Sequence, residues 1–339
     1  MWRHDKLKHI GHSAPFVTCS FFRFQNIVNP MRIVFMGTPA AAVPTLHRCL
    51  EDGHEVVAVW TQPDRPSGRG NKVAFSPIKQ FALDRGLTVH QPSKLKTAET
   101  KSLFASHEAD VAVVVAYGRI LPTEFLTTPR RGCINVHFSL LPLYRGASPV
   151  NWAIVNGEKE TGVTTMFIEP ALDTGPILLQ SKTEVGEDET ASDLMGRLSE
   201  IGANLLGKTL TQLDSLTPRE QNDDAATFAP ILKKEDGLID WTKSAVEIER
   251  GVRGFQPWPN AHTIFNSRGL IIWGAEVTTS TTNSAQPGEI VGAHGDELIV
   301  KCGGQTTLRL TELQPEAKRR MIARDFLNGT HLKVGDRLG

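Results

Sequence analysis

The sequence lacks the features that mark several whole classes of protein. Its 37 basic residues are balanced by 37 acidic ones, so any nucleic acid or membrane partner must be held by a local patch. Its longest strongly apolar run, 111–116, is far too short to cross a membrane, and no membrane partner is expected. Its four cysteines form no Cys-x-x-Cys pair, which argues against structural zinc or a disulfide framework and indicates a reducing, cytoplasmic compartment.

A chain of 339 residues is longer than one hydrophobic core usually requires, so we expect a soluble protein of two domains. Residues 1–30 carry four basic side chains and one acidic side chain, without a helical or strand period. This basic stretch leaves a transit peptide open as an alternative, although it lacks the amphipathic Ser- and Arg-rich pattern of one. We interpret it as a disordered extension or an upstream start, with the true initiator at Met31.

From Met31 onward, short apolar runs alternate with helical periods. The pattern predicts strands at 32–36, 55–61, 88–90, 111–115 and 132–137, with helices at 76–85 and 97–107 between them. Such alternation is typical of an α/β fold with a doubly wound, mostly parallel, Rossmann-like sheet. In that fold the ligand cleft lies at the carboxyl ends of the strands.

The first glycine turn, Gly37-Thr38-Pro39, follows the strand predicted at 32–36. Three alanines come next, so the Gly-x-Gly-x-x-Gly pattern that lets a backbone approach a pyrophosphate is missing. A nicotinamide cofactor is therefore not expected. The turn either begins a helix or holds some other ligand.

The rest of the chain divides at a polar stretch. Residues 190–213 have the apolar spacing of a core helix, and the polar residues that follow read as a connector. We expect an α/β domain at 31–214, a linker at 215–236 and a C-terminal domain at 237–339. Five short strands predict a small β-barrel in the C-terminal domain, at 262–265, 270–277, 288–291, 297–300 and 307–310.

A basic loop follows the second predicted strand. Between Thr61 and Gln80, four basic residues oppose one acidic residue, and glycines flank Arg69. Guanidinium groups suit phosphates, so Arg65, Arg69 and Lys72 are candidates for nucleic-acid contact. Charge alone would favour an ordinary solvated loop, but its length favours a function, because connections in α/β units usually take only a few residues.

The strand at 132–137 ends with two polar side chains that can act together. Asn135 and His137 are two residues apart, so they emerge on the same side of a strand. A further strand, at 162–168, leads to the turn Leu172-Asp173-Thr174-Gly175, which carries a carboxylate. Singly, the histidine reads as a partner of a backbone carbonyl and the aspartate as a turn residue. Together the three side chains form an acid/base and polarising constellation.

Asn135-x-His137-x-Ser139-Leu140-Leu141-Pro142, with Arg145-Gly146 and Leu172-Asp173-Thr174-Gly175, resembles the signature of folate-dependent formyltransferases. The resemblance implies transfer of a formyl group from 10-formyltetrahydrofolate to an amine, with no metal. It assigns catalysis to Asn135, His137 and Asp173. It also implies that Ser139, Leu140, Leu141 and Pro142 contact the folate.

Three further motifs, at 31–39, 61–66 and 68–70, are similar to the branch of that family that formylates methionine on initiator tRNA. This implies a monomer with an OB-like C-terminal barrel. The basic loop would then contact tRNA, together with Lys318 and Arg319 and their basic neighbours Arg320 and Arg324. The alternative for this second cluster is that it caps or solvates the last helix.

Two rival functions remain open at this point. A formyltransferase acting on a small amine, such as glycinamide ribonucleotide or an amino-sugar nucleotide, would share the three catalytic residues. A catalytically silent RNA-binding protein would not bind folate. Two departures from the family pattern also need a structural account: Phe138 replaces a small residue, and Ala40-Ala41 replaces an acidic-aromatic pair.

Overall fold

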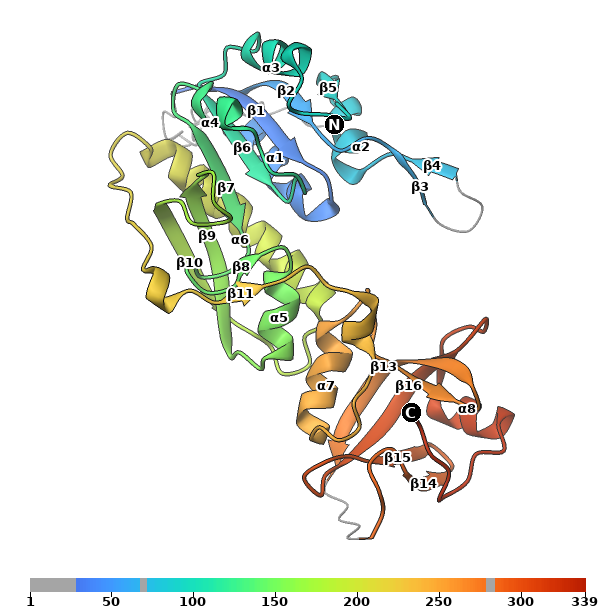
Figure 1. Cartoon of the computed structure of the whole chain (residues 1–339). Helices are drawn as coiled ribbons and strands as arrows, with labels where there is room; N and C mark the ends of the chain where they lie inside the picture. The colour runs from blue at the N-terminus through green and yellow to red at the C-terminus, as the bar shows by residue number, and fades with distance from the viewer. Residues whose placement is uncertain (1–28, 68–71, 279–283) are drawn as a thin grey trace, which may run out of the picture.

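The computed structural model describes residues 29–67, 72–278 and 284–339. The N-terminal domain is built on one mixed sheet in the order β10-β9-β7-β6-β1-β2-β5 (Figure 1). The strands from β7 to β5 in this order are parallel, whereas β9 is antiparallel to both β7 and β10, so the expected mostly parallel sheet is confirmed. The strand bounds are β1 (Arg32–Gly37), β2 (Glu55–Trp60), β5 (Val89–His90), β6 (Val111–Val115), β7 (Cys133–His137), β9 (Glu160–Phe167) and β10 (Ile177–Glu184).

Helices cover both faces of this sheet. One core lies under α1 and α6, and a second, centred on Trp60, Phe104 and Phe125, lies under α3 and α4. The β6 run is buried at every position, as expected for a strand covered on both faces. The helical elements are η1 (Ala40–Ala42), α1 (Val43–Glu51), α2 (Pro77–Leu83), α3 (Ala98–Ala105), α4 (Thr123–Thr127), α5 (Pro149–Val155) and α6 (Ala191–Gln212).

The C-terminal domain carries a separate antiparallel sheet in the order β12-β13-β16-β15-β14, with β17 paired to β16. Within the described residues no pairing joins the edge strands β12 and β14, so the sheet is open and the expected OB-like barrel is not confirmed. The bounds are α7 (Ala245–Gly254), β12 (His262–Phe265), β13 (Arg268–Thr278), β14 (Ile290–His294), β15 (Glu297–Lys301), β16 (Thr307–Pro315), β17 (Met321–Ile322) and α8 (Ala323–Gly329).

The stretch expected to be a linker runs along the N-terminal domain and pairs with it. It contains η2 (Asp223–Ala225), β11 (Phe228–Ala229) and η3 (Lys234–Gly237), and β11 pairs in parallel with β8 (Arg145–Gly146). The two domains then meet where α5 packs on α7. At this contact Nδ2 of Asn151 donates to the carbonyl oxygen of Gly254 at 2.8 Å.

The predicted basic loop contains a hairpin. Strands β3 (Arg65–Ser67) and β4 (Lys72–Ala74) pair antiparallel and project from the N-terminal domain (Figure 1). Arg69 falls at 68–71, outside the described residues. Lys79, the fourth basic residue of the stretch, forms a salt bridge with Asp64 and is mostly buried, so it is not a free cation.

Among the described helices, none is long and apolar enough to cross a membrane.

Burial gives a testable prediction about the thiols. Burial raises the pKa of Cys49, Cys133 and Cys302 to about 12 each, so their reactive thiolates are scarce at mildly alkaline pH. We expect iodoacetamide to leave these three unmodified in the native protein and to alkylate them in concentrated urea. Peptide mass spectrometry measures alkylation under both conditions. The Cys19→Ser variant is used, because Cys19 lies outside the described residues. If Cys49 in the native protein were alkylated faster than the protein unfolds globally, the prediction would be wrong.

Candidate active site

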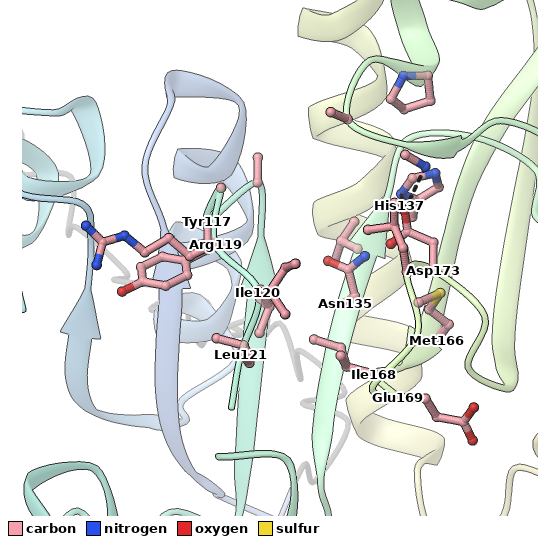
Figure 2. A pocket seen from close by; sticks show the side chains of 18 of the residues that line it. Tyr117, Arg119, Ile120, Leu121, Asn135, His137, Met166, Ile168, Glu169 and Asp173 are labelled. Carbon is pink, nitrogen blue, oxygen red and sulfur yellow. Dashed lines mark hydrogen bonds and ion pairs between the residues drawn. The ribbon is translucent and has the colours of Figure 1, made fainter. Parts of the chain in front are cut away.

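A cavity of about 530 Å³ opens at the carboxyl ends of the parallel strands β6 and β7, where the fold predicts a ligand cleft, and Met166 of β9 also lines it. Figure 2 shows Asn135 and His137 on one wall, with Ile120 and Leu121 opposite and Asp173 beside His137. The structure therefore brings the three predicted catalytic residues to a single cavity. Most of the remaining lining is apolar or backbone, at 116–121, 146–149 and 166–172.

Asn135 presents an available amide. It lies near the end of β7, is half-buried and lines the cavity. In the described part of the chain its side chain forms no hydrogen bond. Its Nδ2 can therefore donate to an oxygen atom bound in the cavity without first breaking an internal contact.

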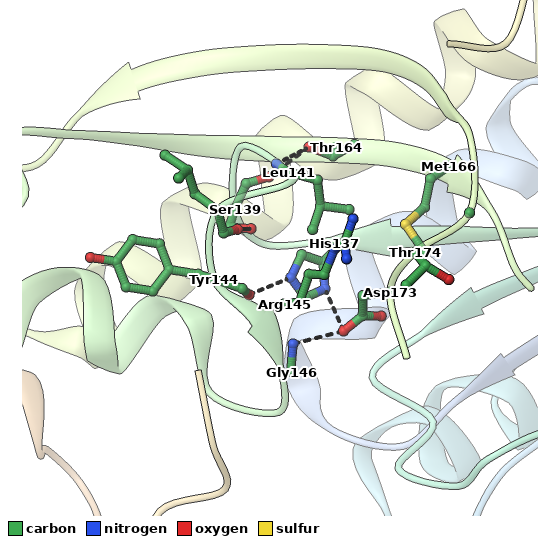
Figure 3. Close-up of polar contacts among 12 residues, drawn as sticks. His137, Ser139, Leu141, Tyr144, Arg145, Gly146, Thr164, Met166, Asp173 and Thr174 are labelled. Atoms are coloured by element: carbon green, nitrogen blue, oxygen red, sulfur yellow. Dashed lines mark hydrogen bonds and ion pairs between the residues drawn. The ribbon is translucent and has the colours of Figure 1, made fainter. Parts of the chain in front are cut away.

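His137 is held in one orientation by the backbone. Its side chain is 6% exposed, and Nε2 lies 2.9 Å from the carbonyl oxygen of Tyr144 (Figure 3). A carbonyl oxygen can only accept, so this contact places a proton on Nε2. The neutral ring then carries its lone pair on Nδ1, which lies 3.8 Å from Oδ2 of Asp173.

Asp173 sits on the loop between β9 and β10 in the left-handed region, with φ of 53°. The main-chain N–H of Gly146 donates to its Oδ2 at 2.8 Å, so one carboxylate oxygen faces both that amide and His137. Gly175 lets this turn close, because a Cβ there would lie 2.0 Å from the carbonyl oxygen of Phe167. Asp173 is therefore both a turn residue and a close neighbour of His137, so the two interpretations of this residue are compatible.

The predicted folate segment lies mostly inside the protein. Ser139 is buried and its Oγ donates to the carbonyl oxygen of Leu143 at 2.6 Å, while the N–H of Leu141 donates to Oγ1 of Thr164 at 3.1 Å. Leu140 and Pro142 are half-buried. None of these four residues is among those that line the cavity. Their contact with folate stays a prediction.

The structure accounts for one of the two departures from the family pattern, Phe138, and nothing in it explains Ala40-Ala41. Phe138 is buried in the core against α6, which has Gly202 at this level. A Cβ on Gly202 would be 3.0 Å from Val136 and 3.5 Å from the Phe138 ring, so this glycine leaves the ring its space. Ala40 and Ala41 belong to η1, whose third residue, Ala42, packs close against Gly37.

Sequence reasoning missed the loop that forms the second wall of the cavity, at 116–121. Ile120 is 81% exposed, an unusual state for a large apolar side chain, whereas Tyr117 is buried with no partner for its hydroxyl among the described residues. Burial raises the pKa of Tyr117 to about 12, so it stays a neutral phenol. The sequence could have indicated this loop, because it directly follows β6 and so lies at the carboxyl ends of the parallel strands.

The basic residues predicted for tRNA lie in two separate places. Arg65 and Lys72 belong to the β3–β4 hairpin. Lys318 and Arg319 are exposed in the connection between β16 and β17, and so precede the last helix instead of capping it. Their neighbour Arg320 is less available, because it pairs with Glu312 and stacks over Trp273.

Within the described residues no group of three or more His, Cys, Asp or Glu could hold a metal ion. The site instead combines a free amide donor with a histidine–carboxylate pair over an apolar cavity, which suits acyl transfer from one bound molecule to another. Residues 31–210 match the family described as formyl transferase, and residues 231–331 match the formyl transferase C-terminal domain. The chain belongs to the formyl transferase family.

Close relatives carry one name. The chain is 49% identical over 312 residues to the methionyl-tRNA formyltransferase of Caldanaerobacter subterraneus subsp. tengcongensis, covering 90% of this chain and 99% of that protein. It is 48% identical over 311 residues to the methionyl-tRNA formyltransferase of Methylococcus capsulatus, covering 91% of this chain and all of the relative (100%).

Solved structures share the fold. The N-formyltransferase from Helicobacter canadensis, in complex with folinic acid and dTDP-3-aminofucose, superposes with a TM-score of 0.63 at 19% identity, over 84% of this chain and 99% of the other. HypX from Aquifex aeolicus, in complex with tetrahydrofolic acid, gives 0.59 at 14% identity, over 88% of this chain and 47% of the other. At these identities the likeness concerns the fold.

The close approach at Gly146 predicts a large cost for a methyl group. Gly146 has φ of 129°, and a Cβ there would lie 2.4 Å from the carbonyl oxygen of Ala229. We expect Gly146→Ala to lower the free energy of unfolding by about 2–4 kcal/mol, measured by urea denaturation. Gly196→Ala is the control, because that position lies in α6 with open space around it, and it should stabilise by about 0.5–1 kcal/mol. Equal effects of both changes would rule out the close approach.

Proposed function

We propose that the chain transfers the formyl group of 10-formyltetrahydrofolate to the α-amino group of methionine esterified to initiator tRNA, giving N-formylmethionyl-tRNA for translation initiation. The observation that carries this proposal is the identity of 49%, over nearly the full length of both chains, with a relative of that name. The site agrees with the chemistry, because Asn135, His137 and Asp173 all line one cavity.

The cavity fits a formyl-folate as cosubstrate. Its volume of about 530 Å³ lies in the usual range for small-molecule sites, and its walls are largely apolar, as a heteroaromatic ring requires. The residues proposed to hold the ring are the cavity-facing ones at 116–121, with backbone groups of Ser139, Leu140, Leu141 and Pro142 at its border. When bound, this cosubstrate supplies the formyl group, and no metal takes part in the proposed reaction.

Asn135 is proposed to stabilise the charge that develops on the formyl oxygen. Attack by the methionyl amine turns that carbonyl oxygen into an oxyanion, and the unengaged Nδ2 of Asn135 can donate to it. One such donor is typically worth about 3 kcal/mol of barrier. A donor without an internal partner serves best here, because it need not give up a bond on the way to the transition state.

His137 is proposed to move the proton. Because Nε2 is engaged with the carbonyl of Tyr144, the lone pair that can take a proton from the attacking amine is on Nδ1. Asp173, 3.8 Å away, would stabilise the resulting imidazolium. The same Nδ1 would then return the proton to the folate nitrogen that leaves. The Tyr144 contact makes this more direct than a role for Nε2 as a second donor to the formyl oxygen.

The tRNA is proposed to lie across two basic regions. One is the β3–β4 hairpin with Arg65, Arg69 and Lys72, and the other is the β16–β17 connection with Lys318 and Arg319. These cations, among them the exposed Lys318 and Arg319, could follow a phosphate backbone although the chain has no net charge. We propose division into a catalytic domain at 31–214, a linker at 215–236 and a tRNA-contacting, OB-like domain at 237–339, in a monomeric cytoplasmic enzyme.

Substitutions at the cavity test this chemistry. We expect Asn135→Ala, His137→Ala and Asp173→Ala each to lower kcat for formylation of methionyl-tRNA by about 100-fold or more, because each removes a group that acts in the transition state. The assay contains 10-formyltetrahydrofolate, with glycinamide ribonucleotide as competing acceptor. Asn204→Ala, an exposed change on α6, is the control for Asn135. Near-normal turnover in the cavity variants would refute the roles, and preferred formylation of the competitor would refute the tRNA substrate.

The basic hairpin predicts a different kinetic signature. Arg69→Ala should raise KM for methionyl-tRNA by about 3- to 10-fold and leave KM for the folate unchanged, because the change removes one proposed phosphate contact and leaves the described residues that line the cavity intact. The tRNA effect should shrink as salt is added. Arg85→Ala, just after α2, is the matched control. An unchanged KM for tRNA in Arg69→Ala would remove the hairpin from the proposed interface.

A further inference from the structure

The segment at 219–229, which we call the strap, follows the N-terminal domain along the border of the site. Its first residue, Arg219, exchanges two main-chain hydrogen bonds with Ile177 at the start of β10, at 2.8 and 2.9 Å. Its last residues form β11, which pairs with β8. Both ends of the strap are therefore anchored on elements that lead into the loops around His137 and Asp173.

The side-chain amide of Gln221 reaches from the strap to the Asp173 turn. Its Nε2 donates to the carbonyl oxygens of Asp173 and Gly175, each at 2.8 Å. An amide nitrogen has two N–H groups, so these bonds use its full donor capacity. Gln221 thus holds the backbone on both sides of Thr174, where Asp173 has its positive φ.

A buried arginine fixes which way that amide points. Oε1 of Gln221 accepts from Nε and Nη2 of Arg145 at 3.0 and 2.8 Å, and Asp223 accepts from Nη2 at 2.7 Å. Arg145 is 4% exposed, and its guanidinium has only hydrogen-bond donors. If the Gln221 amide were flipped, its N–H groups would face those of Arg145. The guanidinium therefore holds Oε1 toward itself and turns Nε2 toward the Asp173 turn.

The strap also holds the other partner of His137. Oγ1 of Thr227 accepts from the N–H of Tyr144 at 2.8 Å, and its carbonyl oxygen accepts from the N–H of Arg145 at 2.9 Å. Tyr144 is the residue whose carbonyl accepts from Nε2 of His137. The strap thus holds the backbone of both residues that flank the imidazole ring, Tyr144 and Asp173.

We infer that the strap positions the His137–Asp173 pair for formyl transfer, and that Gln221 is its principal positioning residue. Gln221 contacts the backbone of Asp173 and does not line the cavity, so it acts through the carboxylate and not on the substrate. The inference rests on the proposed function, because its measure is the rate of that reaction. It assigns part of the scaffold of the active site to a segment that the sequence presents as a polar connector.

The inference gives the strap a quantitative role in the reaction. The Asp173 turn is a left-handed loop whose carboxylate accepts the Gly146 N–H and lies 3.8 Å from His137. If Gln221 no longer donates to the carbonyl oxygens of Asp173 and Gly175, the turn can relax and carry the carboxylate away from Nδ1 of His137. A displacement of about 1 Å in a catalytic group can cost about 100-fold in rate.

Gln221→Glu tests the inference in a double-mutant cycle with Asp173→Asn. Glutamate keeps the size of the side chain and the acceptor for Arg145, but it sets a carboxylate oxygen against the two carbonyls. We expect kcat to fall about 10- to 100-fold with KM for folate and tRNA little changed. In the Asp173→Asn background the same change should alter kcat less than about twofold, because the group it positions is already disabled.

Gln256→Glu is the matched control, because Nε2 of Gln256 also donates to two main-chain carbonyls, those of Val252 and Trp273, at 2.9 and 3.0 Å. It should lower the melting temperature and leave kcat unchanged. If the glutamate variant folds poorly, the double-mutant cycle is repeated with Gln221→Met, which keeps the length of the side chain but neither of its polar atoms. Equal rate losses in both Asp173 backgrounds, or no loss in either, would overturn the inference. Wild-type protein without formyl transfer would instead overturn the proposed function.

Discussion

The contact between Nε2 of His137 and the carbonyl oxygen of Tyr144 orients the imidazole ring on which the proposed chemistry depends. Because a carbonyl accepts and never donates, the contact selects the ring nitrogen that keeps its proton and leaves Nδ1 for the cavity and for Asp173. The rest of the local structure maintains this choice. The β7 strand delivers the ring, the β8–β11 pairing holds the carbonyl, and the Asp173 turn closes on the opposite side.

Side-chain periodicity was enough to predict the central strands of the sheet and the wall of the cavity that carries Asn135 and His137. A run such as Val111–Val115 is apolar at every position because helices cover both faces of a parallel strand, so the sequence alone marks it as central. The two-residue spacing of Asn135 and His137 likewise fixes their common side on β7. The place of the Asp173 turn beside them was expected from neighbouring strand ends and supported by the family resemblance, since no local pattern specifies a contact between residues so far apart in the chain.

Contacts made by backbone groups or by irregular segments could not be predicted. The Tyr144 carbonyl has no side-chain signature, and the pairing of β11 with β8 joins residues about eighty positions apart through main-chain atoms. β10 was missed because its outer half alternates with polar residues at an exposed edge of the sheet. The barrel expected in the C-terminal domain is not confirmed, for a related reason: short strands predict a sheet, but closure depends on how its two edges meet.

Three large apolar side chains line the cavity and are exposed: Ile120 is 81% exposed, Leu172 62% and Ile231 68%. They come from the loop after β6, the Asp173 turn and the segment just beyond the strap, so no single element explains their clustering. Covering one such side chain is worth about 2 kcal/mol. Large apolar side chains that stay exposed at a concave surface are typical of ligand-binding sites, which agrees with the proposed folate site.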